Sequence, residues 1–136
     1  MRILGVDFGR AKIGIAVAET EPRIASPRRT LEASGKLATD AANIVRIALL
    51  EGAELIVVGL PLSMGEETQG SRVCRKLGDE IAGLGSRVAF ADESLTTLGA
   101  ETAMKEAGMK GSQRRKAVDS ESACRILERY MEEHGP

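Results

Sequence analysis

Three acidic residues, Asp7, Glu93 and Asp119, stand at positions where a lone ionised carboxylate is unfavourable. Asp7 lies near the end of a predicted first strand, and Glu93 directly follows the last predicted strand. Because open α/β sheets carry their sites along the carboxyl edge of the parallel strands, we expect Asp7 and Glu93 to lie close together. A charge buried at such an edge must be paired or must bind a cation.

Asp119 belongs to a predicted C-terminal helix and falls in register with its apolar stripe. That stripe consists of Ala123, Ile126, Leu127 and Tyr130. Charged residues such as Glu121, Arg125 and Glu128 occupy the other face. We therefore expect Asp119 to face the sheet, near the first turn of its helix.

Carboxylates that converge raise one another's pKa unless a divalent cation neutralises them. Oxygen ligands suit Mg²⁺ or Mn²⁺, and no His or Cys competes for a softer metal. Such ions can activate a water and stabilise the leaving oxygen of a phosphodiester. The hypothesis is that Asp7 bridges two metals while Glu93 and Asp119 each anchor one side.

Other interpretations of these acids stay open. Asp119 could be an N-cap or first-turn acid that the helix dipole favours. Asp7 could be a turn residue, and Glu93 could pair with a nearby Lys or Arg. Asp92 is a rival for Glu93 that the sequence does not decide.

The N-terminal third predicts three antiparallel strands. Leu4, Val6 and Phe8 alternate with Ile3, Gly5 and Asp7, and a turn at Gly9–Lys12 leads to a second strand over 13–18. A third strand is expected over Arg23–Leu31, at an edge because Pro27 interrupts it. The short connections indicate antiparallel pairing.

The rest of the chain predicts helices alternating with two more strands. The first helix carries the stripe Leu37, Ala41, Ile44, Val45, Ala48 and Leu49 and stops at Gly52; the second carries Val73, Leu77, Ile81 and Leu84. The strands are Leu55–Val58 and Val88–Phe90, and a Gly-rich loop spans Leu60–Gly70. Further helices are expected over Thr96–Ala107 and Ala117–Glu133, with a basic loop at Gly108–Lys116 between them.

Right-handed crossovers make the last two strands parallel to the first. The predicted fold is therefore an α/β domain over residues 1–136. Its five-stranded mixed sheet has three antiparallel strands followed by two parallel ones, with helices on its faces.

The composition limits the kinds of partner. The chain has 19 basic and 20 acidic residues, so it lacks the basic excess of a protein that coats nucleic acid. With no Trp, one Tyr and two Phe, platforms for base stacking are not expected. Cys74 and Cys124 lack metal-ligand spacing and are expected to be buried apolar residues. No apolar run could span a membrane and no signal peptide is evident, so a cytoplasmic protein is expected.

Four segments together resemble the YqgF family, also called RuvX-type Holliday junction resolvases, which is assigned to maturation of the 5′ end of pre-16S rRNA. The segments are Val6–Ala16, Val57–Leu62 with Gly65, Asp92–Thr97 and Arg115–Ser120. The resemblance implies the ribonuclease-H-like fold shared with RuvC resolvases. It also implies that Asp7, Glu93 and Asp119 are the metal-binding catalytic residues.

Two positions depart from the family pattern. Ser94 stands where Arg is more frequent, which removes one candidate phosphate contact. Ser122 stands where RuvC-type resolvases carry a further acid, so the number of metals, one or two, stays open.

Basic residues near the acids could hold the phosphate backbone. Arg10 and Lys12 lie in the turn after Asp7, and the triplet Arg114, Arg115 and Lys116 precedes Asp119. Contacts of this kind position a substrate without reading its bases. The competing interpretation of the triplet is a solvated loop.

These observations predict a hydrolase, a metal-dependent endonuclease that processes the 5′ end of pre-16S rRNA, acting as a monomer or weak homodimer. A Holliday junction resolvase is the second hypothesis, and it would need a symmetric dimer. A third is a catalytically silent module that binds structured RNA. An actin-like or sugar-kinase ATPase is suggested by Asp7-Phe8-Gly9, but such proteins clamp nucleotide between two domains.

Overall fold

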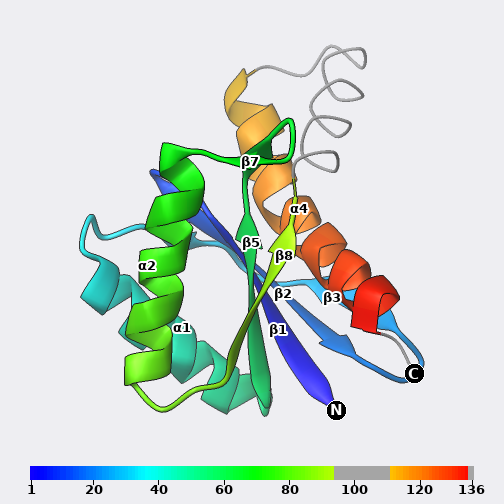
Figure 1. Cartoon of the computed structure of the whole chain (residues 1–136). Helices are drawn as coiled ribbons and strands as arrows, with labels where there is room; N and C mark the ends of the chain where they lie inside the picture. Colours follow the sequence, from blue (N-terminus) through cyan, green and yellow to red (C-terminus); the bar gives the residue numbers. More distant parts are fainter. Residues whose placement is uncertain (94–110, 135–136) are drawn as a thin grey trace.

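A mixed β-sheet forms the centre of the protein, with helices on both faces (Figure 1). The computed structural model describes residues 1–93 and 121–134 in full and the backbone of 111–120. The strands of the sheet are β1 (Arg2–Phe8), β2 (Lys12–Glu19), β3 (Ile24–Pro27), β4 (Leu31–Glu32), β5 (Leu55–Leu60) and β8 (Val88–Asp92). Their order is β3-β2-β1-β5-β8, and β4 also pairs with β2.

The pairing confirms the predicted mixed sheet. β2 is antiparallel to β1, β3 and β4, whereas β1, β5 and β8 are parallel to one another. The predicted third strand was wrong in one respect, because it divides into β3 and β4 and the described sheet has six strands instead of five. Ala16 of β2 pairs with Pro27, and Ile13 of β2 pairs with Leu31. The two β2 residues are three positions apart, whereas their partners are four positions apart. The extra residue interrupts the ladder at an edge position.

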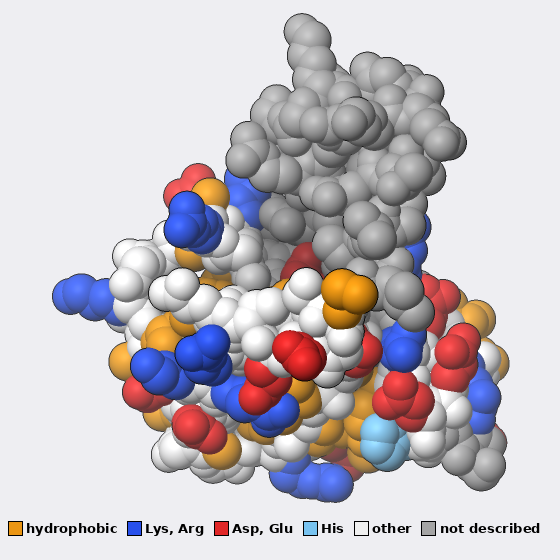
Figure 2. All heavy atoms as spheres, turned by 45° about the horizontal axis from the view of Figure 1, so that its top comes forward, with side chains coloured by type: hydrophobic (Ala, Val, Ile, Leu, Met, Phe, Trp, Pro, Cys, Tyr) orange, Lys and Arg blue, Asp and Glu red, His pale blue; other side chains and the backbone are white. Residues whose placement is uncertain are grey.

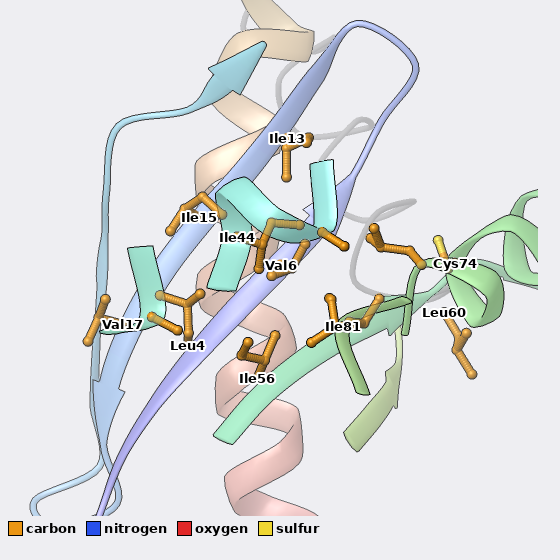
Figure 3. Packing of buried hydrophobic residues seen from close by; sticks show 14 residues of the cluster. Leu4, Val6, Ile13, Ile15, Val17, Ile44, Ile56, Leu60, Cys74 and Ile81 are labelled. Atoms are coloured by element: carbon orange, nitrogen blue, oxygen red, sulfur yellow. The ribbon is translucent and has the colours of Figure 1, made fainter. Parts of the chain in front are cut away.

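Alternation along the strands gives the sheet two buried faces. Helices α1 (Leu37–Glu51) and α2 (Gln69–Gly83) cover one face, and α4 (Gly111–His134) covers the other (Figure 1). The first face packs a large aliphatic cluster that includes Leu4, Val6, Ile56, Val58, Ile44, Leu77 and Ile81 (Figure 3). The second is built from Ile3, Leu55 and Val57 with Ala123, Ile126 and Leu127.

The helical stripes of α1 and α2 were predicted with one error at each C-terminal end. Leu49 is 76% exposed, because Ile44 and Ala48 already define the buried side of α1. Leu84 lies beyond the last residue of α2 and is exposed, while Cys74 joins Leu77 and Ile81 on the buried side. Gly52 ends α1 in a left-handed conformation (φ 72°), as expected for a C-terminal glycine.

Two predicted loops contain regular structure. The segment Leu60–Gly70 includes a hairpin of β6 (Leu62–Ser63) and β7 (Glu66–Glu67). α4 begins at Gly111, six residues before the predicted start, so the predicted loop is helical over 111–116. Gln113, Arg114, Arg115 and Lys116 are good helix formers, and no further glycine or proline occurs before Gly135 to interrupt the helix. The predicted helix Thr96–Ala107 lies outside the described residues.

None of the helices over the described residues combines the length and the apolar character that crossing a bilayer requires.

Glycines in two strands let α4 lie directly on the sheet. A Cβ added to Gly5 would lie 2.6 Å from Leu127 Cγ and 2.8 Å from the Ala123 carbonyl oxygen. A Cβ added to Gly59 would overlap Ile126. Only hydrogen fits at these positions, so the glycines fix the height of the helix above β1 and β5.

We expect Gly5→Ala to lower the free energy of unfolding by about 1–3 kcal/mol, because the new methyl group must displace the α4 backbone. Urea unfolding followed by circular dichroism measures the change. Gly83→Ala is the matched control, since nothing lies within 4 Å of its Cβ position at the end of α2. The control should be neutral or slightly stabilising. Equal midpoints for Gly5→Ala and the unsubstituted protein would contradict the close approach of α4.

Candidate functional site

Asp7 lies near the carboxyl end of β1 and on the face that α4 covers. Leu4 and Val6 belong to the cluster under α1 and α2, whereas Ile3 belongs to the cluster under α4. Alternation therefore places Gly5 and Asp7 on the α4 face. Asp7 is half-buried and pairs in register with Gly14 of β2.

Glu93 follows β8 on the same face as Asp7. Its backbone N–H donates to the Leu60 carbonyl oxygen at 3.2 Å, and the residue is only 5% exposed. Its carboxyl carbon lies 3.1 Å from the position that a Cβ on Gly59 would take, beside Ile126 of α4. Asp92, one residue earlier, continues the alternation of Val88 and Phe90 toward the opposite face. The geometry thus brings Glu93, and not Asp92, to the side of Asp7.

Gly59 lies in β5, between the strand that carries Asp7 and the strand that Glu93 follows, and it lets the Glu93 carboxyl group approach β5 closely. In the register of the sheet, Val6 of β1 pairs with Val58 of β5, and Gly59 of β5 pairs with Ala91 of β8. Gly59 therefore lies in the strand between Asp7 and the end of β8. A side chain here would meet the Glu93 carboxyl group. Sequence reasoning did not single out Gly59, although a glycine inside an apolar strand is a signal of close approach.

The backbone of α4 brings residue 119 to the level of Asp7. Leu127 and the Ala123 carbonyl group of α4 lie over Gly5. Asp7 is two residues further along β1 than Gly5, which moves it about 7 Å toward the carboxyl edge. Residue 119 is four residues before Ala123 in α4, a rise of about 6 Å along the helix axis. Because α4 begins at the carboxyl edge of the sheet (Figure 1), this rise is also directed toward that edge. The side chain of Asp119 lies outside the described part of the structure.

The early start of α4 removes one interpretation of Asp119. The residue lies eight positions after Gly111, and the first turn of α4 contains no acidic residue. Capping and the N-terminal dipole act within the first turn. The interpretation of Asp119 as an N-cap or first-turn acid is therefore wrong.

Four polar residues are buried in the described structure, and they divide by location. Asp40 accepts the Ser34 N–H at 2.9 Å, and Ser71 completes a capping box with Thr68 at the start of α2. These two serve local structure. Glu93 and Ser122 instead lie at the junction of the sheet with α4, and the fully buried Ser122 hydroxyl has no hydrogen-bond partner among the described residues. Ser122 is one helical turn before Ile126, the residue that lies beside Glu93.

The Cys74 thiol in α2 experiences both acids. Burial raises its pKa from 9.0 to about 12, and the negative charges of Glu93 and Asp7 contribute to that rise in that order. Cys74 and Cys124 are both buried free thiols, as expected.

The basic residues are placed only in part. Arg10 is exposed and Lys12 is half-buried in the turn after Asp7. A hydrogen bond of 2.9 Å from the Gly9 N–H to the Lys12 carbonyl oxygen closes this turn. Arg114, Arg115 and Lys116 belong to α4, with side chains outside the described part. Figure 2 shows Lys and Arg side chains on the side where α1 and α2 lie, interspersed with acids.

Among the fully described residues, no three His, Cys, Asp or Glu side chains are grouped as a metal site. The third acid of the predicted set, Asp119, does not belong to those residues. The described part of the site is thus the pair Asp7 and Glu93, which come from the strands on either side of β5.

The buried Cys74 predicts a loss of stability in alkali. Between pH 9 and about 12 the unfolded thiol loses its proton while the folded thiol keeps it, so the free energy of unfolding falls as pH rises above 9. Urea unfolding at pH 8, 9 and 10 measures the slope. Cys74→Ala, which retains Cys124, should have a shallower slope. Parallel slopes for the two proteins would exclude this contribution.

Comparison with known proteins identifies relatives along the whole chain. The family model RuvX, described as Holliday junction resolvase, matches residues 1–133. A protein of Anaeromyxobacter dehalogenans named "Putative pre-16S rRNA nuclease" is 37% identical over 100% of both chains. One of the same name from Actinobacillus succinogenes is 38% identical, with 98% of this chain and 96% of the relative covered.

Solved structures share the fold. Thermus thermophilus RuvC has a TM-score of 0.55 at 11% identity, covering 99% of this chain and 97% of RuvC. The fowlpox virus Holliday junction resolvase has a TM-score of 0.53 at 10% identity, covering 98% and 99%. A ROK family protein from Streptococcus pneumoniae reaches 0.51 at 10% identity, but the match spans only 40% of it.

The sheet order with helices on both faces is thus the ribonuclease-H-like fold of RuvC. With a family match over nearly its full length and relatives named as nucleases, the chain belongs to the RuvX family of nucleases.

Proposed function

We propose that this protein is a metal-dependent endonuclease that hydrolyses a phosphodiester bond of precursor 16S rRNA, with Asp7, Glu93 and Asp119 as the metal-binding catalytic residues. The observation that carries the proposal is the placement of Asp7 and Glu93 on the face of the sheet that is covered by α4, the helix that carries Asp119. The relatives named as pre-16S rRNA nucleases support the choice of substrate.

The residues at the site fit a hard divalent cation. The two described acids offer carboxylate oxygens, which Mg²⁺ and Mn²⁺ prefer. Because Gly59 has no side chain, the Glu93 carboxyl group and Ile126 of α4 can both approach β5 closely there. Burial of Glu93 is unfavourable for an ionised carboxylate, and a nearby cation would offset that penalty. When bound, Mg²⁺ or Mn²⁺ would act as a Lewis acid on the phosphodiester and its attacking water.

The protein contributes position and charge. Asp7 and Glu93 are held by the ends of parallel strands, whose hydrogen bonds fix their spacing. The rigid α4 carries Asp119 to the same edge. Arg10 and Lys12, next to Asp7, and Arg114, Arg115 and Lys116, in α4, are proposed to contact substrate phosphates. The chain is otherwise near neutral, so binding relies on these local charges.

Branched DNA is the second candidate substrate, because the family model is described as a Holliday junction resolvase. Symmetric cutting of a junction would need two copies of the site related by a two-fold axis. Purified protein with Mn²⁺ should be assayed against precursor 16S rRNA ends and four-way DNA junctions in parallel. Specific cleavage of the rRNA precursor is expected; cleavage of the junction alone would favour the DNA substrate.

Asp7→Asn should lower Mn²⁺-dependent cleavage by roughly 100-fold or more, since loss of even an outer partner of a metal site can reduce activity by that factor. Asp92→Asn is the matched control, because it removes a neighbouring acid on the opposite face and should retain activity. Circular dichroism checks that both variants fold, and calorimetry measures Mn²⁺ binding.

Full activity of Asp7→Asn would end the catalytic proposal. Folded protein that binds no Mn²⁺ and cleaves neither substrate would instead favour a module that binds RNA without catalysis. Tight ATP binding in the same calorimeter would favour the kinase-like hypothesis.

A further inference from the structure

The hairpin β6–β7 presents Met64 at the edge of the sheet where the site lies. The hairpin begins at Leu62, two residues after Leu60, whose carbonyl oxygen accepts the Glu93 N–H. Figure 1 shows it at the same end of the sheet as the first turns of α4. The four residue steps from Leu60 to Met64 span at most about 14 Å. Met64 therefore lies within the length of about four stacked bases, at 3.4 Å each, of the Leu60 contact with Glu93.

Met64 differs from the other exposed large hydrophobic residues in the described structure. Its relative exposure is 99%. The others lie near the amino edge of the parallel strands: Met1, Ile24, Leu49, Leu50 and Leu84. Single exposed apolar residues are common, but this one alone among those described stands at the carboxyl edge with the acids.

The turn does not favour methionine. Met64 and Gly65 are its two central residues, and both have positive φ, 52° and 80°. Two-residue hairpin loops with this geometry prefer Asn, Asp or Gly, because a longer side chain is disfavoured in the left-handed region. Neither turn preference nor core packing therefore accounts for a methionine at this position.

The hairpin is mounted firmly on the rest of the protein. Thr68 donates its hydroxyl to the Pro61 carbonyl oxygen at 3.1 Å, which closes the base of the hairpin. Glu67 forms an ion pair with Arg75 of α2, and the Arg75 guanidinium lies 5.4 Å from the ring centre of Phe90 in β8. Met64 is thus presented by a braced turn.

Charge at the tip disfavours contact with phosphates. Glu66 is exposed beside Met64, and the neighbouring Glu67 is neutralised by Arg75. A tip of this kind repels the backbone of a nucleic acid but can approach the flat faces of its bases. The thioether of Met is polarizable and packs well against aromatic rings.

The aromatic residues of the chain are not available for that contact. Phe8 and Phe90 pack against the core, and Tyr130 stacks on His134 near the end of α4. Since the chain has no other Phe, Tyr or Trp, Met64 is the apolar side chain at the described part of this edge that a base could meet.

We propose that Met64 is a base wedge, which inserts beside or between bases of the nucleic acid within a few nucleotides of the cut phosphate and fixes the register of the substrate. Apolar side chains at protein tips commonly act in this way on base steps. The inference depends on the proposed nuclease function of the adjacent site.

The test uses full-length protein and an RNA stem–loop with a single-stranded tail, in which 2-aminopurine replaces one base at successive positions. Unstacking by the wedge should raise the 2-aminopurine fluorescence at one position for the unsubstituted protein and for Met64→Leu. Met64→Asn should lose that signal and bind about five-fold more weakly, an effect comparable to one stacking contact. The salt dependence of binding should stay unchanged, because no phosphate contact is removed.

Met64→Asn should fold at least as well, since Asn suits the turn, and its thermal midpoint controls for unfolding. Equal fluorescence and affinity for Met64→Asn would overturn the proposal, as would a changed salt slope. Loss of self-association in Met64→Asn would show a contact with a second copy instead. Cleavage by the unsubstituted protein is assayed in parallel, so that failure of the wedge proposal can be distinguished from failure of the nuclease proposal. If the protein cleaves the RNA but the fluorescence prediction fails, only the wedge is excluded. If the protein cleaves nothing, the nuclease proposal fails.

Discussion

The arrangement of this protein depends on the direct contact of α4 with the strands β1 and β5. Gly5 and Gly59 allow that contact, since any side chain would meet Leu127 or Ile126. Because both the strands and the helix are rigid, a contact at Gly5 fixes the level of every other residue along α4 relative to the sheet. The level of residue 119 in the α4 backbone relative to Asp7 in β1 follows from this contact.

The two faces of the sheet have different roles. The face under α1 and α2 buries a large aliphatic cluster, which supplies most of the apolar burial and anchors the strands (Figure 3). The face under α4 contains smaller residues such as Ala16, Ala18 and Ala123, and near the carboxyl edge it becomes polar. Glu93 and Ser122 are buried there, where a polar group is retained at a cost in stability. That cost is understandable under the proposed function, in which this site binds a cation and a phosphate.

Patterns within single elements were predictable. Alternation in β1 correctly assigned Asp7 to the face of Ile3 and Gly5, and the apolar run of β5 predicted a strand buried on both faces. The errors arose where a neighbour decides the outcome. The hairpin β6–β7 and the division of β3 from β4 depend on strand pairing. The start of α4 was predicted too late because the helix extends toward its N-terminus beyond the residues of its apolar stripe.

The sequence by itself determined which side chains alternate along the strands and which family the chain resembles, because these follow from local periodicity and residue type. Only the tertiary structure decided that Glu93 rather than Asp92 lies on the face of Asp7, that Gly59 lets the Glu93 carboxyl group approach β5, and that Asp119 is remote from the start of its helix. Each of these depends on contacts between residues distant in the chain, which period and propensity do not encode.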